Sequence, residues 1–226
     1  IMQTIKNSAK FGIKVGKPKI DFASITKRAS HEVDSDAVNI EASIKKAKNI
    51  TLFKGTARFI GQKKLLIKLA DGEREIEADK IVIAAGTRPA IPQVTGLDTL
   101  KYMTSDEALR VEKLPKHLIL IGGGYIAVEL AHFFGSLGSK ITILQRNVRL
   151  LPDEDEEIGN KFTELFSKEY DVRLKFAVKR VEIKKTKNGK SNERKIVVYG
   201  FQGFGHLVIS QENIYSNIQR IWKQNT

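Results

Sequence analysis

Cysteine does not occur anywhere in this chain of 226 residues. Its absence excludes disulfide bonds, zinc–thiolate sites and thiol catalysis within the chain. Long hydrophobic runs are also missing: none approaches the ~18–20 apolar residues that a membrane-spanning helix needs. The first residues do not form the pattern of a signal peptide. We therefore expect a cytoplasmic protein that has no membrane partner.

Acidic residues are scarce relative to basic ones, since 26 Asp and Glu stand against 39 Lys and Arg, for a net charge of +13. Basic proteins often bind nucleic acids or anionic surfaces. Here, however, the lysines are spread along the chain, and there is no zinc finger, RNA-binding aromatic signature or recognition-helix pattern. We interpret the charge as a solvated lysine-rich surface that attracts a polyanionic cofactor at long range, and we expect no nucleic-acid partner.

The first part of the chain is expected to be mainly helical. Residue 1 is Ile rather than Met, so we do not expect translation to start there. Residues 1–17 are compatible with one helix and a short strand. Asp21 is the expected cap of a long polar helix, or of a helix pair, that extends to Asn49.

From Ile50 onward, short apolar segments separated by turn signals predict β-strands. Asp71-Gly72 predicts a tight hairpin. The segment KIVIAAGTRPAIP (80–92) predicts a buried strand that ends at Gly86. A connector follows over residues 94–116, in which Thr104 or Ser105 is suited to cap a short helix.

The second half of the chain alternates strands and helices. LILIGGGYIAVELAHFFGSLGSKITILQ (118–145) predicts a strand, a glycine turn, a helix that ends near Gly138, and a second strand. DEDEEIGNKFTELFSKEY (153–170) predicts a helix with acidic residues in its first turn, where the macrodipole favours them. Residues 172–200 predict strands with an Asn188-Gly189 hairpin turn. QENIYSNIQRIWKQNT (211–226) is interpreted as a short helix with a polar end.

The glycine turn carries the clearest functional signal. Gly122, Gly124 and Ala127 fit the pattern G-x-G-x-x-G/A. Gly122 permits the sharp turn, Gly124 leaves room for a pyrophosphate, and Ala127 lets the helix pack closely on the strand. The phosphates would lie at the helix N-terminus, among N–H groups without intrahelical partners. Because the pattern lies between a strand and a helix, it favours dinucleotide binding over a merely structural turn.

These segments together resemble one family. IVIAAGTRPAIP followed by LILIGGGYIAVELAHFFGSLGSKITILQR is similar to the FAD-dependent pyridine nucleotide–disulfide oxidoreductases, among them dihydrolipoyl dehydrogenase and glutathione, mycothione and mercuric reductases. The resemblance extends to about Tyr199. It implies an α/β fold, with a Rossmann-like NAD(P)-binding domain over 115–226 whose tail diverges from about residue 206. Residues 1–114 would form an incomplete FAD-binding domain, with a helical segment over 1–49 and a β-meander and connector over 50–114.

The resemblance also implies an activity, in which electrons pass from NAD(P)H through FAD to a disulfide-type or metal-ion acceptor. Members of the family are homodimers through a C-terminal domain. The chain is expected to be the central part of such an enzyme, without the N-terminal FAD loop, the redox cysteines or the dimerisation domain. The alternatives are a nucleotide-binding subunit of a split enzyme and a non-functional fragment. No metal site is expected.

The family pattern assigns roles to particular residues. The expected NAD(P) contacts are Gly122, Gly123, Gly124, Tyr125, Ile126, Ala127, Glu129 and Val178. Tyr125 matches the aromatic residue that covers the flavin until nicotinamide displaces it, and Glu129 matches a supporting carboxylate. The alternatives are a surface-packed aromatic for Tyr125 and a solvated helix residue for Glu129. The expected backbone contacts to FAD are Thr56, Ala57, Ala85 and Gly86, which are otherwise ordinary strand ends.

The second strand ends in residues that bear on the choice of dinucleotide. NAD-preferring folds place an acid there that binds the adenosine ribose. This chain has Gln145 instead, followed by Arg146 and, three residues later, Arg149. A guanidinium binds a phosphate bidentately. We therefore expect NADPH to be preferred, with Arg146 as the main contact to the 2′-phosphate and Arg149 assisting. The alternative is that both arginines are solvated turn residues.

The chain by itself is expected to be colourless and to lack NAD(P)H-dependent reductase activity toward disulfides, dyes or Hg(II). Hydride transfer requires an acceptor held against the nicotinamide ring, and this chain has neither a thiol pair nor a second glycine-rich loop. Absorption spectra and turnover assays of the purified chain test this. A stoichiometric yellow flavin, or turnover well above the free-flavin background, would contradict it.

Overall fold

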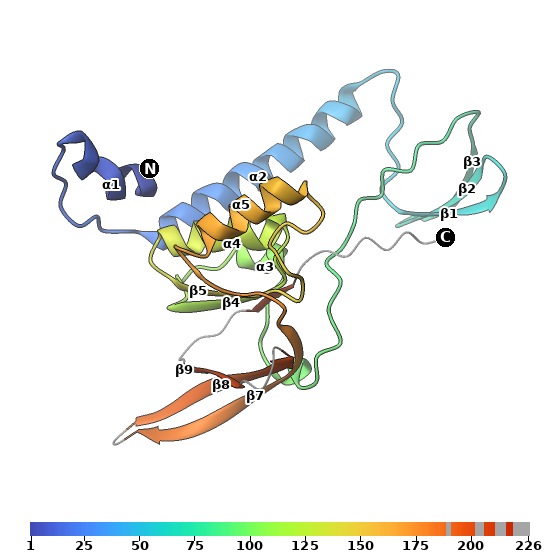
Figure 1. Ribbon diagram of the computed structural model, residues 1–226. Coiled ribbons are helices and arrows are strands. Elements are labelled where there is room, and N and C mark those ends of the chain that lie inside the picture. Colours follow the sequence, from blue (N-terminus) through green and yellow to red (C-terminus); the bar gives the residue numbers. More distant parts are fainter. Residues whose placement is uncertain (189–190, 202–205, 211–215, 219–226) are drawn as a thin grey trace. The chain divides into compact units, whose positions relative to one another are not determined.

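The computed structural model of the chain describes residues 1–188, 191–201, 206–210 and 216–218 (Figure 1). The chain divides into two compact units. The larger unit comprises Ile1–Arg28 and Arg88–Thr226, and the smaller unit comprises Ala29–Thr87. The two units are described separately below. None of the helices in the described ranges is long and apolar enough to cross a membrane.

A parallel sheet forms the centre of the larger unit. In the described part of the chain it has the strand order β10-β4-β5-β6, with bounds Ser216–Ile218, His117–Ile121, Lys140–Leu144 and Asp171–Arg173. All of its pairs are parallel. Helix α4 (Tyr125–Ser136) connects β4 to β5, and α5 (Glu156–Phe166) lies between β5 and β6 in the chain. The predicted α/β fold with its strand–turn–helix–strand unit is therefore confirmed.

Strand β4 is buried on both of its faces. Leu118 and Leu120 belong to the same apolar cluster as Ala131 and Phe134 of α4. Ile119, which points to the opposite face because side chains alternate along a strand, belongs to a second cluster with residues of the neighbouring antiparallel sheet. The apolar run of β4 follows from this double burial, which is typical of parallel strands.

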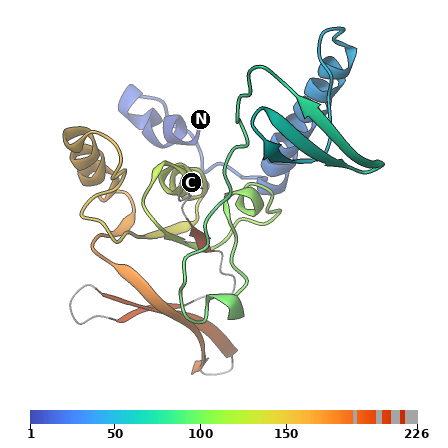
Figure 2. The same cartoon turned by 90° about the vertical axis from the view of Figure 1, so that its right-hand side faces the viewer.

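The antiparallel sheet covers the other face. Its strands β7, β8 and β9 have the bounds Ala177–Asn188, Ser191–Phe201 and His206–Ser210. Figures 1 and 2 both show α4 and α5 on one side of the parallel sheet and these strands on the other. Asn188 pairs with Ser191, so the predicted hairpin is confirmed. Gly189 itself lies outside the described residues.

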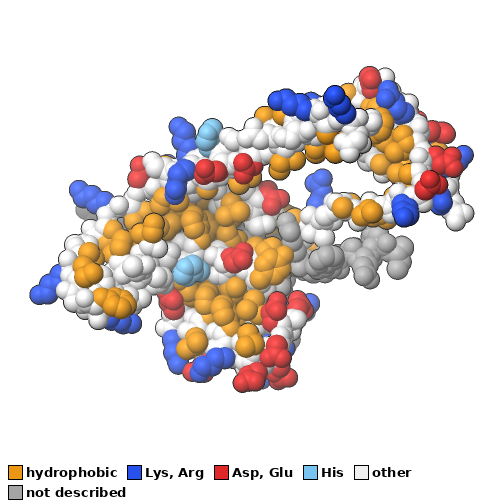
Figure 3. Space-filling view, turned by 90° about the horizontal axis from the view of Figure 1, so that it is seen from above, with side chains coloured by type: hydrophobic (Ala, Val, Ile, Leu, Met, Phe, Trp, Pro, Cys, Tyr) orange, Lys and Arg blue, Asp and Glu red, His pale blue; other side chains and the backbone are white. Residues whose placement is uncertain are grey.

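Helix α5 presents two different faces. Phe162 and Phe166 pack against the apolar cluster beneath it, and their rings stack with centroids 4.9 Å apart. Ile158 and Leu165 are exposed on its surface. Figure 3 looks onto the helices and shows hydrophobic side chains among charged ones there.

Side-chain caps begin α3 (Ser105–Ala108), where the sequence predicts one, and α5, for which the sequence predicts only acidic residues in the first turn. Thr104 caps α3 in a reciprocal capping box with Glu107. Hydrogen bonds from both the backbone and the hydroxyl of Thr104 lower the pKa of the Glu107 carboxyl. Asp155 caps α5 and accepts hydrogen bonds from the backbone N–H groups of Glu157 and Ile158. The predicted end of α4 near Gly138 is also confirmed.

The smaller unit contains most of α2 and a three-stranded meander. Helix α2 spans Phe22–Lys46 as one continuous helix and enters this unit at Ala29. Its start is in the larger unit, where Asp21 accepts a hydrogen bond from Ser24 N, as predicted. The meander strands β1, β2 and β3 span Thr56–Gly61, Lys64–Leu69 and Gly72–Glu77. They pair antiparallel, and the predicted Asp71-Gly72 hairpin is confirmed.

The strand predicted within residues 1–17 is wrong. Helix α1 spans Met2–Asn7 and is followed by the 3₁₀ helix η1 (Ser8–Phe11). Residues 12–21 have no regular secondary structure. Ile13 and Val15 are exposed. Such a strand needs a neighbour to satisfy its backbone groups, and none of the described residues pairs with it.

The buried strand predicted over KIVIAAG is also wrong. Residues 81–94 have no regular secondary structure, and the side chains of Val82 and Ile83 are 88% and 74% exposed. Their apolar, β-branched character favours a strand. A strand nevertheless exists only if a neighbour satisfies its backbone groups, and within the described ranges no segment pairs with this one.

The helix predicted over 211–226 is wrong for the part that the structure describes. Ser216–Ile218 form β10, which pairs in parallel with Ile119, Leu120 and Ile121 of β4. The free edge of β4 supplies backbone partners there, and this tertiary pairing outweighs the local helical preference. The remainder of that prediction lies outside the described residues.

A buried polar chain links β4, β5 and β6. Thr142 Oγ1 donates to Asp171 Oδ2 at 3.1 Å, so His117 Nε2, which lies 3.0 Å from the same hydroxyl, is the donor in that contact. His117 is only 6% exposed. Burial, with a smaller contribution from Lys140 that Asp171 opposes, lowers the pKa of His117 to about 4 from its ordinary 6.5. The folded protein therefore holds this imidazole neutral at moderately acidic pH.

This burial predicts a pH dependence of stability. Between pH 6.5 and about 4 the unfolded chain binds a proton at His117 that the folded chain does not, so acidification across this window destabilises the fold. The slope from one such group is at most about 1.4 kcal/mol per pH unit. Denaturant titrations of wild type and His117→Gln, which keeps a neutral donor, should show a difference that changes across this window. Parallel pH profiles for the two proteins would contradict the prediction.

Candidate dinucleotide-binding site

A glycine turn lies at the carboxyl end of β4, where α4 begins. Gly122 has a φ of 110°, a left-handed conformation that favours glycine. Its N–H donates to the carbonyl of Leu144 at 2.8 Å, which ties the turn to the end of β5. The position and the conformation both agree with the turn that the sequence predicts.

The N-terminus of α4 has no side-chain cap. Gly124 is the N-cap residue and no side chain caps this helix within the described chain. The first N–H group in a helical hydrogen bond is that of Val128, which donates to Gly124 O. The N–H groups of Tyr125, Ile126 and Ala127 therefore have no intrahelical acceptor. With the helix dipole they form a site suited to an anion.

Gly123 packs more tightly than the sequence indicates. A Cβ atom on it would lie 2.7 Å from Leu150 Cδ2 and 2.9 Å from Gln145 Nε2. Its carbonyl accepts a hydrogen bond from Leu151 N at 2.7 Å. The middle glycine is thus needed for contact with the segment that follows β5.

The first turn of α4 separates buried from exposed positions. Ala127 is buried in the apolar cluster between helix and sheet, and Ile126 packs against that cluster from its edge. Tyr125 is 53% exposed, and Glu129, one helical turn later, is also exposed. The structure places both side chains on the solvent side of the helix, next to the uncapped N-terminus.

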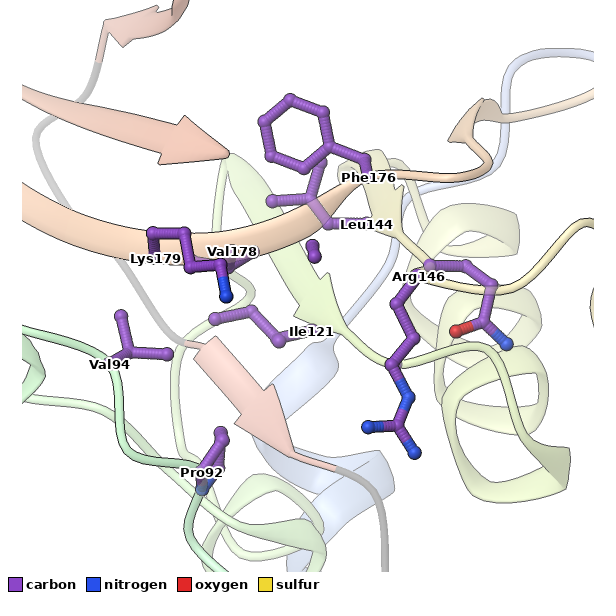
Figure 4. A pocket seen from close by; sticks show the side chains of 11 residues that line it. Pro92, Val94, Ile121, Leu144, Arg146, Phe176, Val178 and Lys179 are labelled. Atoms are coloured by element: carbon purple, nitrogen blue, oxygen red, sulfur yellow. The ribbon is translucent and has the colours of Figure 1, made fainter. Parts of the chain in front are cut away.

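A pocket of about 240 Å³ opens beside the glycine turn. Its lining comprises Pro92, Val94, Ile121, Gly122, Leu144, Gln145, Arg146, Phe176, Ala177, Val178 and Lys179. Figure 4 shows Val94, Ile121, Leu144 and Val178 around its apolar part. The same view shows Arg146 extending away from Phe176 and Leu144. The pocket therefore combines apolar walls with a cation at the end of β5.

Gln145 lines the pocket, but it is almost entirely buried. It is 2% exposed, and its side-chain Nε2 donates to the carbonyl of Arg149 at 3.3 Å. Its backbone donates to Arg173 O and accepts from Phe176 N. The sequence shows that this position is neutral, but not that its amide is part of the loop's interior.

The two arginines occupy different surroundings. Arg146 is exposed and lines the pocket. Arg149 does not belong to that lining. One of its terminal nitrogens donates to the carbonyls of Pro152 and Glu154, at 3.2 and 3.4 Å. The sequence suggests that both arginines contact the 2′-phosphate, whereas the structure brings only Arg146 to the pocket.

The residues predicted to contact FAD all lie in the smaller unit. Thr56 and Ala57 are exposed at the start of β1. Ala85 and Gly86 are exposed in the irregular segment after β3. No group of acidic, histidine or cysteine residues that could hold a metal ion is found in the described part of the chain.

Sequence reasoning missed several residues of the pocket. Val94 comes from the connector before α3, and Pro92 from the irregular segment that precedes it; Lys179 lies in β7, and Phe176 is the residue before that strand. Val178, which the family pattern does indicate, lies among them. Local sequence carries no signal for Pro92 and Val94, because tertiary contacts bring this part of the chain to the edge, namely the bridge between Thr95 and Arg180 and the packing of Val94 in the cluster with Ile119 and Leu144.

Comparisons with known proteins agree with this arrangement. A mercuric reductase from Shewanella putrefaciens is 36% identical over 171 residues, covering 75% of this chain and 30% of that protein. A mycothione reductase from Mycobacterium tuberculosis is 31% identical over 176 residues, covering 76% and 38%. A dihydrolipoyl dehydrogenase from Bacillus subtilis is 34% identical over 166 residues, covering 73% and 36%. The chain thus spans between 30% and 38% of these relatives' own lengths.

A solved structure extends the similarity to the fold. The HOCl-induced flavoprotein disulfide reductase RclA from Escherichia coli superposes with a TM-score of 0.68 at 26% identity, covering 95% of this chain and 45% of that one. The family model described as pyridine nucleotide-disulphide oxidoreductase matches residues 5–200. The chain therefore belongs to the pyridine nucleotide–disulphide oxidoreductase family.

Proposed function

We propose that the larger unit binds NADPH as the electron donor of a flavin-dependent oxidoreductase. The observation that carries this proposal is the uncapped N-terminus of α4, placed at the carboxyl end of β4 beside a pocket that presents Arg146. Ligands of open α/β sheets bind at this edge. The family relationship supports the same reading.

The pyrophosphate would lie at the glycine turn. Three backbone N–H groups, those of Tyr125, Ile126 and Ala127, are available to its oxygens, and the helix dipole favours its negative charge. The turn offers no side chain between Gly122 and Gly124, so the phosphates can approach the backbone closely.

The adenosine half would occupy the neighbouring pocket. Its apolar walls, which include Ile121, Leu144 and Val178, suit the adenine ring. The nicotinamide half would extend along the exposed side of α4, where Tyr125 and Glu129 lie. Tyr125 is the residue we propose to cover the flavin until nicotinamide displaces it, with Glu129 in support.

FAD would accept the hydride from NADPH and pass electrons on, which is the chemistry that this cofactor supplies when bound. Thr56, Ala57, Ala85 and Gly86 are the residues of the smaller unit that we propose to contact it. The chain has no cysteine, so a dithiol that reduces a disulfide would have to come from residues outside it. We propose a disulfide-type compound or a metal ion as the final acceptor, in an assembly that is a homodimer.

The preference for NADPH rests on residues 145 and 146. Gln145 is neutral and buried, so the end of β5 presents no carboxylate that would repel a 2′-phosphate. Arg146 lines the pocket and is exposed, so its guanidinium is available to such a phosphate. A phosphate dianion gains more from a bidentate guanidinium than a hydroxyl does.

Replacing Arg146 with alanine is expected to weaken NADPH binding and to leave NADH binding nearly unchanged. Loss of one charge-assisted phosphate contact costs about 1.5–3 kcal/mol, or roughly ten- to hundred-fold in affinity. Isothermal titration calorimetry with both dinucleotides measures this. Lys161→Ala, which removes an equal charge on the exposed surface of α5, is the matched control.

Two outcomes would count against this assignment. Equal affinity of the wild type for NADPH and NADH, or a ratio that Arg146→Ala does not change, would remove Arg146 as the specificity residue. Binding of neither dinucleotide by the wild type would contradict the dinucleotide site itself.

A further inference from the structure

The segment that joins β5 to α5, residues 145–155, is folded by bonds within its interior. We refer to it as the β5–α5 loop. Leu150 N donates to the buried hydroxyl of Thr163 at 2.9 Å, which ties the loop to α5. That hydroxyl donates in turn to Gly159 O at 2.7 Å. The backbone of Leu151 has a φ of 49°, a left-handed conformation that costs free energy and persists only where neighbouring contacts hold it.

The Arg149 side chain crosslinks this loop through hydrogen bonds to the loop's own backbone. Its Nη2 donates to the carbonyls of Pro152 and Glu154, which lie on the far side of the strained Leu151. Its stem lies against α5 so closely that a Cβ on Gly159 would be 2.9 Å from Arg149 Nε. Arg149 Nε is buried and has no acceptor among the described residues. The half-buried guanidinium is therefore directed at the loop's own carbonyls.

The same loop is hydrogen-bonded to the glycine turn and packs against it. Leu151 N donates to Gly123 O at 2.7 Å, and Gln145 Nε2 donates to the carbonyl of Arg149. Gly123 itself lies against the side chains of Leu150 and Gln145. Any shift of residues 149–151 therefore reaches the backbone at Gly123, one residue before the α4 N-cap. Arg146 lies between Gln145 and Asn147, whose backbone groups bond to Arg173, Phe176 and Lys175, so its position does not depend on residues 149–151.

We infer that Arg149 is a positioning residue for the dinucleotide site: its guanidinium fixes the β5–α5 loop and, through Leu151, the glycine turn that holds the pyrophosphate. The inference rests on the proposed function and replaces the phosphate contact that the sequence suggests for Arg149. Because NADH and NADPH share the pyrophosphate, loss of Arg149 weakens both by the same factor. Loss of Arg146 weakens only NADPH.

Calorimetry on the full chain separates the two roles. Arg149→Met keeps an unbranched stem against Gly159 but removes the hydrogen bonds to Pro152 and Glu154. We expect its affinities for NADH and NADPH to fall by the same factor, about ten-fold, as for the loss of a charge-assisted hydrogen bond. Arg149→Lys keeps one donor on a flexible stem and should recover part of the loss. All titrations are run at a temperature where circular dichroism shows each variant folded.

A second variant disturbs the contact between Arg149 and Gly159 from the α5 side. Gly159→Ala places a methyl group where Arg149 Nε and Cδ lie, so it should displace the arginine and weaken both dinucleotides in the same way. Combined with Arg149→Ala, which removes both the stem and the hydrogen bonds, it should add little, since both changes remove one interaction. Amide hydrogen exchange at Leu151, which should accelerate in each variant, gives a readout of the loop that does not depend on binding.

The outcomes decide between the roles. Equal losses for the two dinucleotides, with partial recovery in Arg149→Lys, support the inference. A selective loss of NADPH affinity would make Arg149 a phosphate contact, and a lower Tm with both affinities unchanged would make it a purely structural residue. Either of these overturns the inference. If the wild type binds neither dinucleotide, the proposed function fails and the inference fails with it, whereas a binding wild type with the wrong variant pattern overturns the inference alone.

Discussion

The burial of β4 between two apolar layers is the constraint on which the site depends. Leu118 and Leu120 pack under α4, while Ile119 packs toward the antiparallel sheet. A shift of β4 by one residue would exchange these faces, so the strand has a single acceptable register. That register fixes where β4 ends, and therefore where Gly122 turns the chain and α4 begins. The uncapped N-terminus of α4 is thus positioned by the core.

The parts of the fold that depend on short-range patterns could be predicted from the sequence. Strand β4, the glycine turn and α4 follow from an apolar run, a turn signal and a helical period in succession. Thr104 and Asp21 were recognisable as caps because their hydrogen bonds reach only two or three residues along the chain. The same reasoning wrongly predicts a buried strand over KIVIAAG and a helix where β10 lies. A strand exists only where a neighbour offers backbone groups, and sequence pattern does not reveal which neighbours are present.

The same distinction applies to the site. Gly122, Gln145 and Arg146 could be named from the sequence, since they follow from the glycine pattern and from the end of the second strand. Pro92 and Val94 could not, because they reach the pocket through tertiary contacts, among them the bridge between Thr95 and Arg180. The burial of Gln145 was also hidden, because a glutamine after a strand usually faces solvent, and only Gly123 beside it leaves space for its amide.

Arg146 and Arg149 show why residue type and spacing are insufficient to assign a role. Both are arginines in one short loop, and either could reach a phosphate in an extended chain. The loop instead turns back at Leu151, whose left-handed backbone brings the carbonyls of Pro152 and Glu154 toward Arg149. The direction of the Arg149 guanidinium is then set by where acceptors lie within the loop. Arg149 meets acceptors of its own chain, and Arg146, which lines the pocket, is the one of the two presented to a ligand.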